Sequence, residues 1–227
     1  MRINFKELKQ SHPNSEIWII GGGASMNYVH PSFFDGKIVI GINEAFTKYQ
    51  HCTYFMRKDG RGWLGRDVIE HIKTVSPASK LIVSDYNGCA KEWGQNIFDT
   101  DLDYWYFDHP CGHGEMDESV LPRVISEGIF PNGIGSSGIA IAIAAYLGAK
   151  NIILCGNDAV KLDGKGYFKE YDNPTGEYIC PMSHEDVLNW QNGQNVIVAN
   201  FFRKTGINIH GLNAFINLRL EEHTYIR

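Results

Sequence analysis

The sequence predicts an α/β protein with a Rossmann-like, doubly wound and mostly parallel sheet that carries lid insertions. Short runs of apolar, branched residues recur along the chain, and several of them end in a glycine turn or a polar residue. Helical stretches lie between these runs, which is the order of elements found in α/β folds. The runs are continuously apolar instead of alternating, as expected for parallel strands buried on both faces of a sheet.

Six apolar runs are the expected strands, at residues 16–20, 37–41, 52–56, 80–84, 151–155 and 207–210. Three helices are expected between them, at residues 67–73, 138–147 and 183–204. Gly148 follows the second helix, and glycine commonly ends a helix. Ser183, with Asp186 three residues later, has the pattern of a helix N-terminus. A break of the last helix near Gly193 is an alternative.

The length of 227 residues fits one domain. We therefore expect a single Rossmann-like domain over residues 1–227, with insertions at about 87–132 and 161–181. Both segments have poor periodicity; the first is rich in aromatic residues, the second in glycine, tyrosine and charge. Ligands of open α/β sheets bind at the carboxyl ends of the strands, so we interpret both insertions as lids over a site there.

Composition and charge exclude several classes of protein. Hydrophobic residues make up 43% of the chain, which is ordinary for a packed core and excludes whole-chain disorder. The net charge of −5 argues against electrostatic coating of nucleic acid. The longest apolar run, 139–149, is too short to cross a bilayer, and no secretory signal is found. Five scattered cysteines indicate neither a disulfide framework nor a zinc ribbon. We expect a cytoplasmic protein.

A glycine turn follows the first expected strand. It contains Gly21, Gly22, Gly23 and Ser25. Backbone N–H groups of such a turn can approach a phosphate closely, and a following helix N-terminus adds a favourable dipole. The turn lacks the Gly-x-Gly-x-x-Gly dinucleotide pattern, and Asn43 follows the next strand where an acidic residue would bind a ribose. We predict phosphate or nucleotide binding; a tight turn that needs glycine for its geometry is the alternative.

Polar residues also flank two later elements. Ser136 and Ser137 precede the helix expected to begin near Gly138, where their hydroxyls can either cap the helix or hold an anion. The spacing does not decide between these two roles. Asp158 ends the strand at 151–155, where carboxylates commonly hold a ribose, a metal or an acceptor hydroxyl. A turn-forming aspartate is the alternative.

Histidines and basic residues supply further candidates. His184 lies at a helix start after the second insertion, where a neutral imidazole can act as general base, although a lone histidine more often has no such role. Four residues of metal-binding type stand at alternate positions of an expected loop, at His109, Cys111, His113 and Glu115. Their spacing matches no standard zinc signature, and we predict no metal site. Basic residues at 57–66 are expected in a solvated loop, with a phosphate contact of Arg57 or Lys58 as the alternative.

In combination these motifs resemble a known group of proteins. They are Gly-Gly-Gly-Ala-Ser at 21–25, Gly-Ile-Asn at 41–43, Gly-Ser-Ser-Gly-Ile-Ala at 135–140 and Leu-Gly-Ala-Lys-Asn-Ile-Ile-Leu-Cys-Gly-Asn-Asp at 147–158. The group includes the bacterial sialyltransferases of glycosyltransferase family forty-two and the archaeal 6-hydroxymethylpterin diphosphokinase-like family, with small phage and prophage members. The resemblance covers about residues 16–60 and 133–213.

The resemblance implies roles for particular residues. The implied nucleotide site consists of Gly21, Gly22, Gly23, Ser25, Asn43, Ser136, Ser137, Gly138 and Asp158. A histidine after the lid is the base for the acceptor hydroxyl in the sialyltransferases, and His184 stands in the corresponding place. Their lid tyrosines assist the leaving phosphate; Tyr167 and Tyr178 are the candidates here, with Tyr171 as a third. The proline of the family's glycine turn is Ala24 in this chain.

The function so implied is a nucleotide-dependent transferase, a glycosyltransferase that moves a sugar from a CMP- or UDP-type donor to an acceptor hydroxyl without an obligatory cofactor. An ATP- and magnesium-dependent diphosphokinase of the pterin type, with Asp158 and Asp59 as metal ligands, is the alternative. A non-catalytic nucleotide-binding phage protein is a third. The expected partners are the small-molecule donor and acceptor. A nucleic-acid acceptor gains no support from the charge, and a homo-oligomer stays open.

Overall fold

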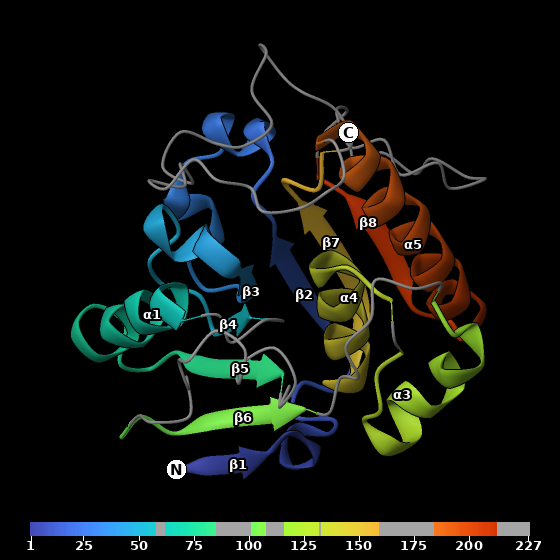
Figure 1. Ribbon diagram of the computed structural model, residues 1–227, viewed down its shortest axis with the longest axis horizontal. Helices are drawn as coiled ribbons and strands as arrows, with labels where there is room; N and C mark the ends of the chain where they lie inside the picture. Colours follow the sequence, from blue (N-terminus) through green and yellow to red (C-terminus); the bar gives the residue numbers. More distant parts are fainter. Residues whose placement is uncertain (58–61, 85–100, 108–115, 132, 159–183, 213–227) are drawn as a thin grey trace.

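The computed structural model describes residues 1–57, 62–84, 101–107, 116–131, 133–158 and 184–212. Within these residues the strands form one sheet, in the order β1-β6-β5-β4-β3-β2-β7-β8. Every neighbouring pair of strands is parallel. Helices pack on both faces of this sheet (Figure 1). The predicted doubly wound, mostly parallel α/β fold is confirmed.

The strands are β1 (Arg2–Asn4), β2 (Ser15–Ile20), β3 (Ile38–Ile42), β4 (Tyr54–Arg57), β5 (Lys80–Ser84), β6 (Tyr104–Phe107), β7 (Ala149–Cys155) and β8 (Asn208–Gly211). The α-helices are α1 (Gly62–Thr74), α3 (Leu121–Glu127), α4 (Ser136–Tyr146) and α5 (His184–Lys204). Short 3-10 helices are η1 (Phe5–Leu8), η2 (Ala24–Tyr28), η3 (Pro31–Phe34), η4 (Asn43–Thr47) and η5 (Glu118–Val120). All six expected strands and three expected helices are present within a few residues. The last helix is continuous through Gly193.

Alternate residues of the central strands enter two separate cores. In β2, Ile17 and Ile19 belong to the core under α3, α4 and α5, whereas Trp18 and Ile20 belong to the core under the 3-10 helices and α1. All four side chains are buried. Burial on both faces explains why the strand sequences are continuously apolar.

The apolar run after residue 138 forms α4, a helix buried on all sides. Its residues from Gly138 to Tyr146 are buried between the sheet and the neighbouring helices, and Figure 1 shows α5 lying beside it. Gly148 follows the helix with φ +99, as predicted for the residue that ends it. No helix in the described part of the chain is long and apolar enough to cross a membrane.

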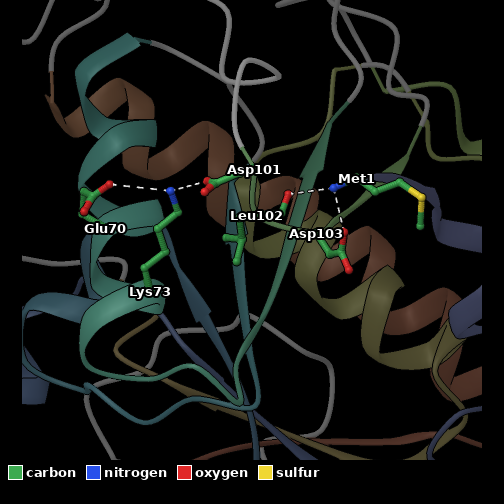
Figure 2. Close-up of polar contacts among 6 residues, drawn as sticks. All are labelled: Met1, Glu70, Lys73, Asp101, Leu102 and Asp103. Carbon is green, nitrogen blue, oxygen red and sulfur yellow. Dashed lines mark hydrogen bonds and ion pairs between the residues drawn. The ribbon is translucent and has the colours of Figure 1, made fainter.

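Strand β6 lies inside the range 87–132 that was expected as an insertion, and it pairs with both β5 and β1. Figure 2 shows the contacts just before it. Lys73 of α1 forms an ion pair with Asp101. The α-amino group of Met1 lies 2.7 Å from Asp103 Oδ1 and donates to Leu102 O at 3.2 Å. The charged groups are exposed, so these ion pairs are expected to contribute little to stability.

The order of the strands reverses next to β2. From β2, the strands β3, β4, β5 and β6 follow on one side, and β7 and β8 lie on the other. In open α/β sheets the loops at such a reversal part from one another, and ligands bind outside the carboxyl ends of the strands there. This topology directs attention to the segments that follow β2 and β7.

Candidate functional site

The glycine turn after β2 is joined to β7 through the backbone. The N–H groups of Gly21 and Gly23 donate to the carbonyl oxygens of Cys155 and Gly156, each at 2.8 Å. A Cβ atom on Gly21 would lie 2.6 Å from Gly156 O, closer than real Cβ contacts allow. Two of the turn's N–H groups are therefore used within the protein. These glycines permit close packing of two backbones.

Asp158 closes the same junction from the end of β7. Its Oδ2 accepts a hydrogen bond from Ser25 N–H and its Oδ1 accepts one from the Ser25 hydroxyl, each at 2.6 Å. Both residues are buried. Burial raises the pKa of Asp158, and the two hydrogen bonds from Ser25 oppose that rise. A Cβ atom on Gly23 would lie 2.6 Å from Asp158 Oδ2, so glycine is required beside this carboxylate.

Asn43 follows β3 directly and has a left-handed backbone, with φ +52. Asparagine is one of the few residues that adopt this conformation readily. The next residue, Glu44, accepts a hydrogen bond from Arg57 at 3.1 Å. Arg57 is only 2% exposed, so the expectation of a solvated basic loop is wrong for this residue, which ends a buried strand. The pair fixes the backbone next to Asn43.

Two side chains that follow β3 hold the segment after the glycine turn. Lys48 Nζ and Tyr49 Oη both donate to Met26 O, at 2.6 and 2.8 Å. Tyr49 Oη also donates to Val29 O at 3.1 Å. The turns that follow β2 and β3 are thus fixed relative to each other.

The N-cap residue of α4 has no side chain that could cap the helix. This residue is Gly135, and the first intrahelical hydrogen bond runs from Ile139 N–H to Gly135 O at 3.0 Å. Ser136 and Ser137 are the first two helix residues and are partly exposed. The interpretation of these serines as helix caps is therefore wrong. The N–H groups of the first turn form a positive end that suits an anion.

Helix α5 contacts the loop before α4 through Gln194. Its Oε1 accepts a hydrogen bond from Gly135 N–H at 2.7 Å, and its Nε2 donates to Gly133 O. The next residue, Asn195, donates through Nδ2 to Asn157 Oδ1 at 3.5 Å. Sequence reasoning missed both residues, because an amide inside a helix has no distinctive spacing and its partners are distant in the chain.

The structure places the other predicted residues as follows. Gly21, Gly23, Ser25 and Asp158 are joined by hydrogen bonds or close packing, and His184 is the first residue of α5. Tyr167, Tyr171 and Tyr178, Asp59 and the loop from His109 to Glu115 lie outside the described residues. Among the residues that the structure describes, no group of three histidine, cysteine, aspartate or glutamate side chains is arranged to hold a metal ion.

The two described cysteines are unsuited to nucleophilic chemistry. Cys52 and Cys155 are buried free thiols. Burial raises the pKa of Cys52 to about 12 and raises the pKa of Cys155 as well. Since the thiolate is the reactive form, both side chains act as small core residues at neutral pH.

Comparison with known proteins shows a likeness of fold. No family model and no curated protein matches the chain. Among solved structures, it is similar to the sialyltransferase CstII from Campylobacter jejuni in complex with a substrate analogue, cytidine-5'-monophosphate, with a TM-score of 0.53, 15% identity and coverage of 95% of this chain and 89% of CstII. The complex of CstII with CMP-3FNeuAc gives a TM-score of 0.50, 15% identity and coverage of 93% and 89%. The chain thus has a sialyltransferase-like fold.

Proposed function

We propose that this chain is a glycosyltransferase that moves a sugar from a nucleotide-sugar donor, of CMP or UDP type, to an acceptor hydroxyl. One observation carries the proposal: the chain has the fold of a sialyltransferase solved with CMP. In this fold the strand order reverses between β2 and β7, and the N-cap residue of α4, the helix just before β7, is a glycine with no side chain to cap the helix. Anionic donors bind at such reversals and at such helix ends.

The donor is expected to lie across the carboxyl ends of β2, β3 and β7. The N–H groups of Gly21 and Gly23 bind β7, so those of Gly22 and Ala24, which alternate with them, are assigned to the nucleotide phosphate. Asn43 is assigned to the nucleotide. The first turn of α4 binds the donor's anionic group; its residues are Ser136, Ser137 and Gly138. Asp158 and Ser25 hold the glycine turn in place.

The proposed reaction is an inverting displacement. His184 removes the proton from the acceptor hydroxyl while that oxygen attacks the anomeric carbon, and the bond from this carbon to the nucleotide phosphate breaks. The departing nucleotide keeps the electron pair of that bond. Tyr167 or Tyr178 donates a hydrogen bond to the leaving phosphate, so the reaction needs no metal ion.

Ligand-dependent unfolding tests the nucleotide site. The unfolding temperature is measured with the CMP, UDP, GDP and ADP series and with ATP, each with magnesium or with EDTA. A ligand at 100 times its Kd stabilises a protein by about 2.7 kcal/mol. Stabilisation by CMP or UDP compounds, equal with both additives, supports the proposal. Stabilisation by ATP with magnesium alone indicates a diphosphokinase, and no stabilisation by any nucleotide excludes the site.

Substitution of the proposed base tests the reaction. His184→Ala is expected to lower the rate of sugar transfer about 10²- to 10⁴-fold, the usual contribution of a general base, while nucleotide affinity stays nearly constant. His51→Ala is the matched control, because His51 is exposed and lies in the connection between η4 and β4. Equal loss of transfer and of nucleotide binding in His184→Ala would contradict the assignment.

A further inference from the structure

The structure assigns a positioning role to Gln194: we propose that its side chain holds the loop at 133–135, and so the N-terminus of α4, in the geometry that binds the anionic group of the donor. The nature of the ligand rests on the proposed function. The mechanical part of the proposal rests on contacts within the described chain, and the two parts are tested separately below.

Gln194 replaces a cap that the sequence of α4 lacks. In a capping box a side chain of the helix itself reaches back to the N–H group of the N-cap residue. Here Gly135 is the N-cap, and its N–H group donates to Gln194 Oε1, which belongs to a different helix. The other end of the same amide binds Gly133 O. One side chain, itself 6% exposed, therefore satisfies two main-chain groups of the loop.

The packing beside this amide leaves little space for the loop to move. A Cβ atom on Gly138 would lie 2.7 Å from Ile134 Cγ1 and 3.3 Å from Asn195 Oδ1. The first turn of α4 is therefore in direct contact with α5. Because Gln194 and Asn195 are adjacent, the same part of α5 contacts both the loop before α4 and the first turn of α4.

Helix α5 also contacts the segment that follows β7, next to the strand-order reversal. Asn195 donates to Asn157, which follows β7. Asn157 Nδ2 and Asn195 Oδ1 are buried and have no hydrogen-bond partner in the described part of the chain. His184 begins the same helix, about 15 Å from Gln194 along its axis. Helix α5 therefore both holds the loop at 133–135 and carries the proposed base. Displacement of α5 is expected to disturb both together.

Gln194→Met tests this role. Methionine is similar in length but leaves Gly135 N–H and Gly133 O buried without partners. We expect affinity for CMP, measured by calorimetry, to fall about tenfold or more, because buried unpaired groups make the loop geometry unfavourable. Amide hydrogen exchange at residues 134–138 is expected to become faster. Asn208→Ala is the control: it removes an exposed hydrogen bond to Asn151 and should change neither measurement.

The outcomes separate the two proposals. If the wild type binds CMP and Gln194→Met binds it with the same affinity, the positioning role is overturned and the glycosyltransferase proposal stays intact. If amide hydrogen exchange at residues 134–138 is the same in Gln194→Met and wild type, the positioning role is overturned, whichever ligand the protein binds. If the wild type binds neither CMP nor UDP, the proposed function is overturned. The proposal that the N-terminus of α4 binds a sugar donor is then overturned as well. If Gln194→Met does not fold, Gln194→Glu keeps the acceptor for Gly135 and loses the donor to Gly133. Unchanged affinity in that variant is equally decisive against the proposal.

Discussion

Asp158 accepts both hydrogen bonds that Ser25 can donate, one from the main chain and one from the hydroxyl, each at 2.6 Å, although the two residues are 133 positions apart. This contact joins the end of β7 to the turn after β2, where the strand order reverses. It also places an ionisable group in a buried position. Its protonation is therefore linked to the stability of the fold.

The pH dependence of stability should change in Asp158→Asn. An asparagine amide can accept from Ser25 N–H and donate to the Ser25 hydroxyl oxygen, so both contacts persist without a charge. Burial raises the pKa of Asp158 above its ordinary value of 3.8. A raised folded-state pKa gives stability that is present below pH 3.8 and is lost as pH rises through the folded-state value. The variant should therefore gain stability relative to the wild type as pH increases toward neutrality.

Urea unfolding of both proteins at a series of pH values from about 3 to about 7 measures this difference. Asp158→Ala is the companion variant, because it leaves both Ser25 donors buried without an acceptor. It should lower the free energy of unfolding by about 1–3 kcal/mol. If the difference in free energy of unfolding between Asp158→Asn and wild type does not change with pH, protonation of the Asp158 carboxylate is not linked to folding.

Two glycine-to-alanine changes should have opposite effects. Gly23→Ala places a Cβ atom 2.6 Å from Gly156 O and Asp158 Oδ2, and should destabilise the protein by about 1–3 kcal/mol. Gly193 lies inside α5 with open space where its Cβ would be, so Gly193→Ala should stabilise by about 0.5–1 kcal/mol. Thermal unfolding of both variants checks the pair. Equal stability of Gly23→Ala and wild type would mean that the two loops can separate at little cost.

Removal of Glu44 should be costly because its partner is buried. Arg57 has a side chain only 3% exposed, and Glu44 accepts from its guanidinium. Glu44→Ala would leave a buried cation without that partner, for an expected loss of about 3 kcal/mol in the free energy of unfolding. Glu127→Ala is the control: its ion pair with Arg123 is exposed on a helix surface, and its loss should matter much less. Similar effects of both changes would argue against burial as the cause.

The sequence predicted the fold well because continuous apolar strands and small-residue helices are local signals. The runs at 16–20 and 151–155 became the adjacent central strands β2 and β7. Strands β1 and β6 were missed, since β1 has a single apolar residue among its three and the aromatic residues of β6 were assigned to an insertion. Pairing across about a hundred residues defines them, and sequence patterns do not report such pairing.

The contacts of individual candidate-site residues could not be predicted from the sequence. Gly21 and Gly23 were singled out for phosphate binding, but the structure shows that their N–H groups bind β7. Arg57 was expected in solvent because basic residues follow it, yet it ends a buried strand. Gln194 carried no signal, because the hydrogen bonds that give it a role exist only after α5 packs against the loop before α4. Such roles depend on long-range packing and not on spacing.

The parallel arrangement has a consequence for the order in which the chain can fold during its synthesis. Asn4 of β1 lies beside Tyr106, 102 positions later, and one edge of β2 has no partner until β7 has been made. When the ribosome has released only the first half of the chain, the available strands are β1 to β6, with the backbone of β2 open along the side that β7 will occupy. Open strand edges pair readily with other chains. Nascent and truncated forms that end before β7 should therefore aggregate, and productive folding must wait for the second half of the chain.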